Sequence, residues 1–198
     1  MKKSTRIEGE GVVLKPTGKA DRRRVYEWLC RSDITACVLG PPLYPEHQVP
    51  TWEEFCEGYP ESFFSPAGDG AGRVYLIFVD GEEVGTVGYD LLDRARDRVV
   101  LDIWMRGERF CGRGFGHRAL EALVRHLHGT YGIGTFVISP SARNGRAVAA
   151  YRKAGFEPAG LLDRQAQEAE FGLSEYDDNV LMIRRIVQFR VRENTAVR

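Results

Sequence analysis

A glycine-rich segment is the part of this sequence whose residue types and spacing point most clearly to chemistry. It reads Arg109-Phe110-Cys111-Gly112-Arg113-Gly114-Phe115-Gly116. Glycines at alternate positions let a backbone bend closely around a ligand and turn successive N–H groups toward it. An amphipathic helix is expected to begin near Phe115, and a helix N-terminus adds partial positive charge. The pattern indicates a phosphate or pyrophosphate site, with a plain tight turn as the alternative.

Two common nucleotide-binding motifs do not fit this segment. A P-loop ends in Gly-Lys-Ser/Thr, whereas Gly116 is followed by His117 and Arg118. A Rossmann fingerprint follows the first strand of a βαβ unit and has an acidic residue about 20 positions later. This segment follows the fourth expected strand, and Gly132-Ile133-Gly134-Thr135 stands where that acid should be.

A single carboxylate, Asp102, interrupts the apolar run of residues 99–105 (VVLDIWM). An unpaired charge in such a strand is costly, so we expect burial to raise the pKa of Asp102. A raised pKa suits a general base that works near neutral pH. The alternative is a buried salt bridge between Asp102 and one of the nearby arginines.

Hydrophobic periodicity predicts the elements that must position these residues. Residues 74–79 and 82–91 flank the pair Asp80-Gly81, which predicts a β-hairpin with a type I′ turn. Thr51 and Glu54 form a capping box for a short helix that cannot run past Tyr59-Pro60. The other expected strands lie at 11–15, 99–105, 135–139, 157–162 and 180–187. Further helices are expected after Asp21, from about Phe115 and at 144–154, and residues 40–50 are expected to be irregular.

The order of these elements is one strand, two helices, three strands and then α-β-α-β-β. This order predicts an α+β fold with a mixed central sheet and helices on both faces. No linker divides the chain, so residues 1–198 are expected to form a single domain with a polar tail from about 188.

Composition excludes several other classes of protein. Lys plus Arg number 28 and Asp plus Glu number 28, so no global field favours nucleic acid or an anionic membrane. The four cysteines lack CxxC spacing and no histidine pair completes a zinc set, so no metal is expected. No signal peptide and no run of about 18 to 20 apolar residues is present, which predicts a cytoplasmic protein. We expect a monomer or a homodimer.

Two motifs together resemble the GCN5-related N-acetyltransferase (GNAT) superfamily. The first is Arg109-x-x-Gly112-x-Gly114, which resembles the family pattern Gln/Arg-x-x-Gly-x-Gly/Ala. The second is Asn144-Gly145-Arg146-Ala147-x-x-x-Tyr151-x-x-x-Gly155-Phe156. The resemblance covers at least residues 74–186, and it is nearest to aminoglycoside 6′-N-acetyltransferases and ribosomal-protein N-acetyltransferases.

The resemblance implies where acetyl-coenzyme A would lie. The family has a V-shaped split, here between the strand ending at Met105 and the strand at Val137. The pyrophosphate would be bound by the backbone amides of Arg113, Gly114, Gly116 and His117. The pantetheine arm would pair with the backbone near Trp104 and Met105, with Asn144 on its other side. The two motifs add Arg109, Gly112, Phe115 and Ala147 as further cofactor-binding residues.

The same resemblance implies the catalytic residues. In aminoglycoside 6′-N-acetyltransferases the proposed base is an aspartate ten residues before the first loop glycine, and Asp102 stands ten residues before Gly112. The superfamily uses a tyrosine at the position of Tyr151 to protonate the coenzyme thiolate, so the resemblance implies that role here. Tyr151 lies seven residues after Asn144, on the same helix face. A core aromatic is its alternative role. A backbone N–H near Met105, fixed by a strand irregularity, would stabilise the oxyanion.

These features predict an acetyl-coenzyme A-dependent N-acetyltransferase that acts on a primary amine of a small cationic molecule, such as an aminoglycoside-like, polyamine or amino-acid-derived amine. No Ser-His-Asp or Cys-His arrangement is recognisable, which favours direct attack in a ternary complex. A cationic acceptor could be attracted by Glu53, Glu54, Glu57, Glu61, Asp177 and Asp178, which could equally be solvated surface residues. The alternatives are a protein N-terminal or ribosomal-protein acetyltransferase and a non-catalytic acyl-coenzyme A-binding sensor.

Overall fold

The computed structural model describes residues 6–39, 49–160, 169 and 178–186. The described helices are α1 (Arg22–Cys30), α2 (Thr35–Leu39), α3 (Trp52–Gly58), α4 (Phe115–Tyr131) and α5 (Gly145–Lys153). The described strands are β1 (Ile7–Gly9), β2 (Val12–Pro16), β3 (Arg73–Val79), β4 (Glu82–Asp93), β5 (Arg98–Met105), β6 (Thr135–Ile138), β7 (Glu157–Pro158) and β8 (Met182–Arg185). Short 3₁₀ turns lie at Lys19–Asp21, Glu61–Phe64, Pro66–Gly68 and Glu108–Phe110.

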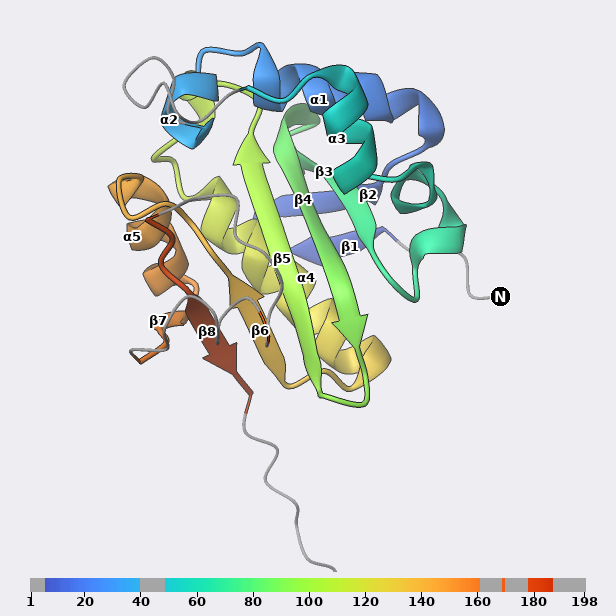
Figure 1. The fold of residues 1–198 in the computed structure, drawn as a ribbon, viewed down its shortest axis with the longest axis vertical. Helices are drawn as coiled ribbons and strands as arrows, with labels where there is room; N and C mark the ends of the chain where they lie inside the picture. The colour runs from blue at the N-terminus through green and yellow to red at the C-terminus, as the bar shows by residue number, and fades with distance from the viewer. Residues whose placement is uncertain (1–5, 40–48, 161–168, 170–177, 187–198) are drawn as a thin grey trace, which may run out of the picture.

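The described strands form one mixed sheet in the order β1-β2-β3-β4-β5-β6-β8-β7 (Figure 1). Strands β1 to β5 are antiparallel neighbours, whereas β5 and β6 run parallel. Strand β8 then lies between β6 and β7 and is antiparallel to both. The mixed sheet predicted from the order of elements is therefore confirmed.

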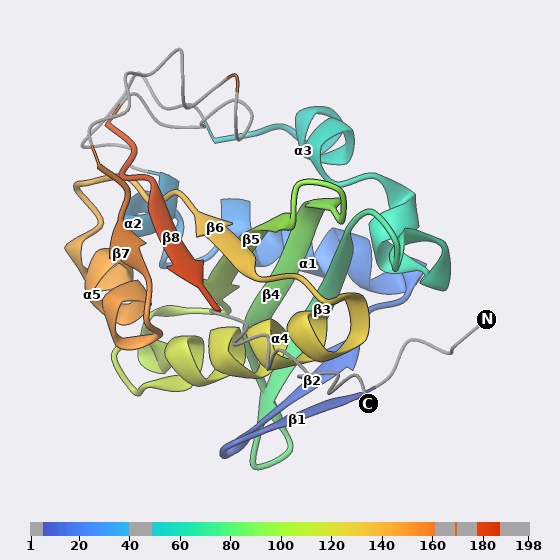
Figure 2. The ribbon, with the colours of Figure 1, turned by 90° about the horizontal axis from the view of Figure 1, so that it is seen from below.

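Each face of the sheet carries its own hydrophobic core. Figure 2 shows α4 on one side of the sheet and α1 with α3 on the other. Because side chains alternate along a strand, Tyr75 and Leu101 pack with the apolar face of α4. Val74 and Trp104 point the other way and pack with α1 and α3. The predicted helices on both faces are confirmed, and β5 contributes side chains to both layers.

Several local predictions are confirmed by backbone geometry. The Thr51 hydroxyl accepts a hydrogen bond from the Glu54 amide at 3.2 Å, and the Glu54 carboxylate accepts one from the Thr51 amide at 2.8 Å. Asp80 and Gly81 both have positive φ angles, 49° and 84°, as a type I′ turn requires. Helix α5 ends just before Gly155, whose φ is 79°.

The N-terminal region differs from the sequence-based expectation of a single strand at 11–15. It forms a hairpin in which Ile7 pairs with Leu14 and Gly9 with Val12. Gly11 makes the turn at a φ of 63°. Only Ile7 of the short strand β1 is buried, which leaves too few apolar residues for periodicity to reveal it. Helix α2 was also missed, because five residues are too few for a helical period.

Some expectations lie wholly or partly outside the described residues. These are residues 40–48 of the irregular stretch expected at 40–50, the end of the strand at 157–162, the last residue of the strand at 180–187, and the tail from about 188. Across the described part of the chain, no helix combines the length and apolar character needed to span a membrane.

Candidate active site

The sheet divides between β5 and β6. The two strands pair only from Arg98 with Thr135 to Val100 with Val137, whereas β5 continues to Met105. Beyond Val100 the edge of β5 therefore faces a cleft of about 840 Å³. Residues from both faces of the sheet line this cleft, together with the start of α4 and one side of α5. The predicted split between the two strands is present.

The glycine-rich loop closes one end of the cleft. Gly112 and Gly114 have φ angles of 71° and 81°, a left-handed conformation that a residue with a Cβ adopts only at a cost. Gly114 is the N-cap of α4 and provides no side-chain cap for the first-turn amides. Those amides need an acceptor, and Arg113, Gly116 and His117 line the cleft beside them. The loop is thus suited to an anionic group.

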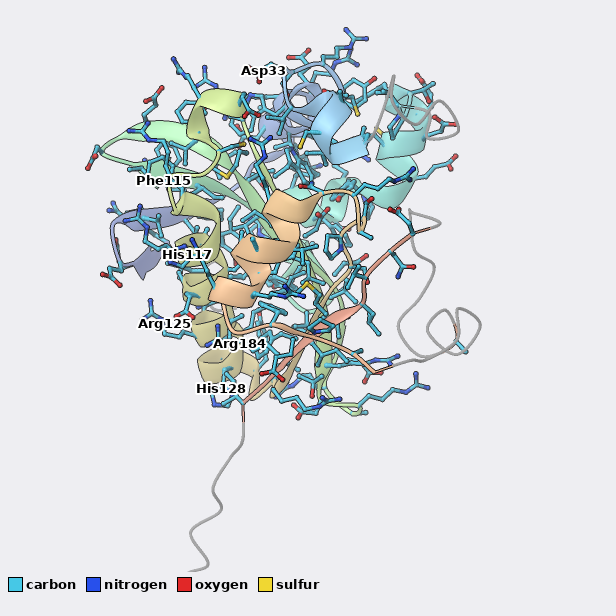
Figure 3. The ribbon with its side chains drawn as sticks, turned by 90° about the vertical axis from the view of Figure 1, so that its left-hand side faces the viewer. Asp33, Phe115, His117, Arg125, His128 and Arg184 are labelled. Atoms are coloured by element: carbon cyan, nitrogen blue, oxygen red, sulfur yellow. The ribbon has the colours of Figure 1, made fainter. Side chains whose placement is uncertain are left out.

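Nearly all of the predicted cofactor residues meet at this cleft. Its lining includes Trp104, Met105, Gly112, Arg113, Gly114, Phe115, Gly116, His117, Asn144 and Ala147. Figure 3 shows Phe115 and His117 near one end of α4 and His128 at the other end. Arg109 is not among the lining residues, because its exposed side chain pairs with Glu82 at 2.6 Å and lies over the ring of Phe110.

Asp102 extends from β5 into the cleft and is held by two hydrogen bonds. Its Oδ2 accepts a hydrogen bond from the Tyr59 hydroxyl, and its Oδ1 accepts one from the Ile103 amide at 2.8 Å. Among the described residues no lysine or arginine forms an ion pair with Asp102. The salt-bridge alternative therefore finds no partner in the part of the chain that the structure describes.

The surroundings of Asp102 act on its pKa in opposite directions. Burial raises the pKa of Asp102 most strongly, and the nearby Asp90 carboxylate raises it further. The hydrogen bonds from Tyr59 and from the Ile103 amide lower the pKa, but the net direction is upward. Asp90 on β4 also lines the cleft, and Gly88 directly opposite Asp102 adds no side chain there. This wall can therefore attract a cation and accept its proton.

Tyr151 reaches the cleft from α5, on the opposite side of the split from Asp102. Its side chain is largely buried, and burial raises the pKa of its hydroxyl above 10, with a smaller contribution from the charge on Asp102. The phenol therefore stays protonated throughout the neutral range, as a general acid requires.

Helix α5 is fixed at its start by Asn144. The Asn144 side chain accepts a hydrogen bond from the Ala147 amide at 3.1 Å, so the predicted helix cap is confirmed. At the rim of the cleft, Arg146 bonds to Glu108 at 2.8 Å and to the sulfur of Cys37 at 3.2 Å. The pKa of Glu108 is lowered by its hydrogen bond from Arg146.

One prediction about the backbone is wrong. The pairing of β5 with β4 is continuous from Val100 to Met105, so β5 has no irregularity near Met105. The register shift in this region lies in β4 instead. There Gly85 pairs with Ile77 of β3, whereas Glu83 pairs with the next β3 residue, Phe78, so one β4 residue is left over.

The glutamates expected to attract a cationic acceptor have structural contacts or lie away from the cleft. Glu54 caps α3, Glu61 pairs with Lys19, and neither Glu53 nor Glu57 is among the lining residues. Asp178 bonds to Ser141 and Arg143. Asp177 lies outside the described residues. Within the described chain, no group of three or more His, Cys, Asp or Glu side chains could hold a metal ion.

Sequence reasoning missed two cleft residues beside Asp102, Tyr59 and Asp90. Tyr59 was seen only as the residue at which α3 must end before Pro60. Its contact with Asp102 joins residues 43 positions apart, which no local pattern reveals. Asp90 could have been suspected, because it is a carboxylate within a predicted strand of a hairpin next to Asp102.

Comparison with known proteins adds a family match. A family described as the acetyltransferase (GNAT) domain matches residues 12–157. The spermine/spermidine N(1)-acetyltransferase of Bacillus subtilis is 33% identical over 92 residues, which are 44% of this chain and 60% of that protein. The chain thus matches about three fifths of the length of this relative.

Two further similarities cover more of the chain. The aminoglycoside N(6′)-acetyltransferase type 1 of Klebsiella pneumoniae is 27% identical over 163 residues, 77% of each chain. A solved structure of RimL, a ribosomal L7/L12 α-N-protein acetyltransferase in complex with coenzyme A, has a TM-score of 0.67 at 22% identity. That match covers 92% of this chain and 98% of RimL.

Proposed function

The chain belongs to the acetyltransferase (GNAT) domain family, and we propose that it transfers an acetyl group from acetyl-coenzyme A to a primary amine of a small cationic molecule. The amine attacks directly within a ternary complex, and residues 1–198 act as one catalytic domain. The observation that carries this proposal is the cleft between β5 and β6, which brings Asp102, Tyr151 and the glycine-rich loop to one space.

The cleft has the features needed to hold coenzyme A. The uncapped amides at the start of α4 and the left-handed glycines of the loop suit its pyrophosphate. The unpaired edge of β5 near Trp104 and Met105 offers backbone groups to the amides of the pantetheine arm. Acetyl-coenzyme A supplies the acetyl group as an activated thioester.

The acceptor end favours an ammonium group. Asp102 and Asp90 provide two carboxylates on the same wall, while Tyr59, Trp104 and Phe63 line the same cleft with aromatic rings. Carboxylates and ring faces both attract cations. The similarity to the Bacillus subtilis and Klebsiella pneumoniae proteins, whose names specify polyamine and aminoglycoside acceptors, supports this choice.

Proton transfers link these groups to the reaction. The acceptor enters as an ammonium ion and must lose a proton before its nitrogen can act as a nucleophile. Asp102 takes that proton, which its raised pKa favours. Tyr151 gives a proton to the leaving thiolate, because its phenol is still protonated at neutral pH.

A panel of acceptors tests the proposal. We would measure thiol release from acetyl-coenzyme A with spermidine, kanamycin and a peptide that begins with serine. Release that depends on spermidine or kanamycin supports a small cationic acceptor. Release with the peptide alone would support the protein N-terminal alternative, and binding of the coenzyme without release with any acceptor would support the non-catalytic sensor.

A further inference from the structure

The Asp102 carboxylate is already engaged on both of its oxygens in the free protein. Oδ1 accepts from the Ile103 amide, a backbone group fixed within β5. Oδ2 accepts from the Tyr59 hydroxyl, a side chain that also lines the cleft. The phenol is the partner that can leave, because rotation of one side chain removes it, whereas the amide belongs to a paired strand.

A hydrogen-bond donor on Oδ2 opposes the function proposed for Asp102. A carboxylate that accepts a hydrogen bond is stabilised in its charged form and is a weaker base. Besides the Ile103 amide, the side chains that act on Asp102 are Tyr59, at the end of α3, and Asp90 of β4, and the charge of Asp102 acts in turn on Tyr151 of α5. Of these, Tyr59 alone donates a hydrogen bond to the carboxylate among the described residues. Proton transfer from an ammonium to Oδ2 is therefore easier once the phenol has moved.

Two hydrogen bonds fix the main chain of Tyr59, and two aromatic side chains pack against its ring. Arg22 donates to the Tyr59 carbonyl at 2.8 Å, and the Tyr59 amide bonds to the Phe55 carbonyl at 2.8 Å. The ring stacks on Phe55 with ring centres 4.7 Å apart, and it packs edge to face on Trp104 with ring centres 5.6 Å apart. Because the phenol oxygen lies on the long axis of the ring, the hydroxyl leaves Asp102 only when the whole ring rotates about χ1, away from its contacts with Phe55 and Trp104.

Trp104, whose ring contacts Tyr59, carries a donor that the described residues leave unsatisfied in this arrangement. Its side chain is 5% exposed, and Nε1 finds no acceptor within the described part of the chain. A buried donor without a partner costs free energy. A rearrangement of Tyr59 when a ligand binds would change the surroundings of this N–H as well.

We propose that Tyr59 is a positioning residue whose hydroxyl occupies the acceptor's place on Asp102 in the free protein, and that the acceptor ammonium displaces it. The inference rests on the proposed function, because it assumes that an ammonium binds at Asp102. The displaced phenol returns when the product leaves, since an acetylated nitrogen is neutral and no longer pairs with the carboxylate.

Replacement of Tyr59 by phenylalanine tests this inference, with Tyr26→Phe as the matched control. Tyr26 also packs on Phe55, with ring centres 5.4 Å apart, but its hydroxyl bonds to the Pro50 carbonyl and not to Asp102. Loss of a competing hydrogen bond to a charged group should tighten binding of the ammonium about ten-fold or more. Tyr59→Phe should therefore lower the KM of the accepted amine and leave kcat unchanged, because the phenol has already left in the ternary complex.

A second arm needs no acceptor. Carbon-13 NMR titration of the Asp102 carboxyl in the free protein should give a higher pKa in Tyr59→Phe than in the wild type, with no change in Tyr26→Phe. The acidic limb of kcat/KM should move to higher pH in the same variant. An unchanged Asp102 titration overturns the inference, as does a lower kcat with unchanged KM, which would mean that the phenol stays on Asp102 during the reaction.

The two arms separate the inference from the proposed function. Spermidine and kanamycin are the probes, with binding to the coenzyme A complex measured by calorimetry. If neither amine binds or is acetylated, the proposed function and the inference are both contradicted. If either is acetylated by the wild type and by Tyr59→Phe with equal KM, only the inference is overturned.

Discussion

At the scale of single residues, Asp102 must be charged to act as a base, so activity should fall as the pH drops through its raised pKa. Asp102→Asn should remove this acidic limb and lower kcat/KM by about 10² to 10⁴, the usual contribution of a general base. The measurement is the pH profile of kcat/KM with the best acceptor of the panel. A variant that keeps the wild-type value would remove Asp102 from the mechanism.

The same substitution should make the protein more stable at neutral pH. The pKa of Asp102 is higher in the folded protein than in the unfolded chain. The stability that this group contributes is therefore fully present below the unfolded pKa, and it is lost as the pH rises through the folded pKa. Asp102→Asn should therefore melt above the wild type at pH 7, and the difference should vanish below about pH 4. Circular dichroism melts at both pH values measure this. A variant that melts well below the wild type, while its folded fraction keeps full turnover, would support a structural salt bridge instead.

Tyr151→Phe removes one hydroxyl and leaves the ring in place. The ring packs against Phe156 with ring centres 6.5 Å apart. Because this packing does not involve the hydroxyl, the variant should keep the fold and the affinity for acetyl-coenzyme A. Turnover should fall by about 10² to 10⁴ if the phenol protonates the thiolate. Steady-state rates and calorimetric titration with coenzyme A separate the two effects. Unchanged turnover would assign that proton to another group.

At the scale of elements, the junction between the glycine-rich loop and α4 makes a prediction of its own. Gly114→Asp places a carboxylate where the pyrophosphate is expected, at a φ of 81°. Ligand that binds only the native state stabilises it by about 2.7 kcal/mol at 100 times Kd. Millimolar acetyl-coenzyme A should raise the Tm of the wild type and not that of the variant.

Gly129→Ala is the matched control for this junction. Gly129 lies in α4, far along the helix from the loop, and a Cβ there meets nothing within 4 Å. This variant should keep the full shift with acetyl-coenzyme A and gain about 0.5 to 1 kcal/mol of stability. Equal shifts in all three proteins would exclude the loop as the coenzyme site.

Elements with strong local signals were predictable from the sequence. The capping box of α3, the type I′ turn at Asp80-Gly81 and the cap of α5 at Asn144 follow from side chains that satisfy nearby backbone groups or favour positive φ. The strand expected at 11–15 is present as β2, whereas β1 and helix α2 were missed because their short segments lack a full hydrophobic period. The bulge in β4 was misplaced to β5, since register depends on pairing between strands and not on either strand alone.

At the scale of the whole molecule, the two halves of the site differ in how far sequence reveals them. The proposed coenzyme half lies in two contiguous motifs, so the sequence could suggest residues of the loop and the start of α5 that the structure brings to the cleft. The proposed acceptor half is assembled from β4, β5 and the residue that ends α3, and its central contact joins Tyr59 to Asp102 across 43 positions. Such a contact follows only from the packing of helices against the sheet.

Mass spectrometry of the amine would show whether the protein transfers an acetyl group to it. Wild-type protein would be incubated with acetyl-coenzyme A and spermidine or kanamycin, beside the double variant Asp102→Asn, Tyr151→Phe. Direct acetyl transfer predicts that at least one of these amines gains the mass of one acetyl group with the wild type, that the protein itself gains none, and that the double variant gives little product. Wild-type protein that binds acetyl-coenzyme A and leaves both amines unmodified would contradict it.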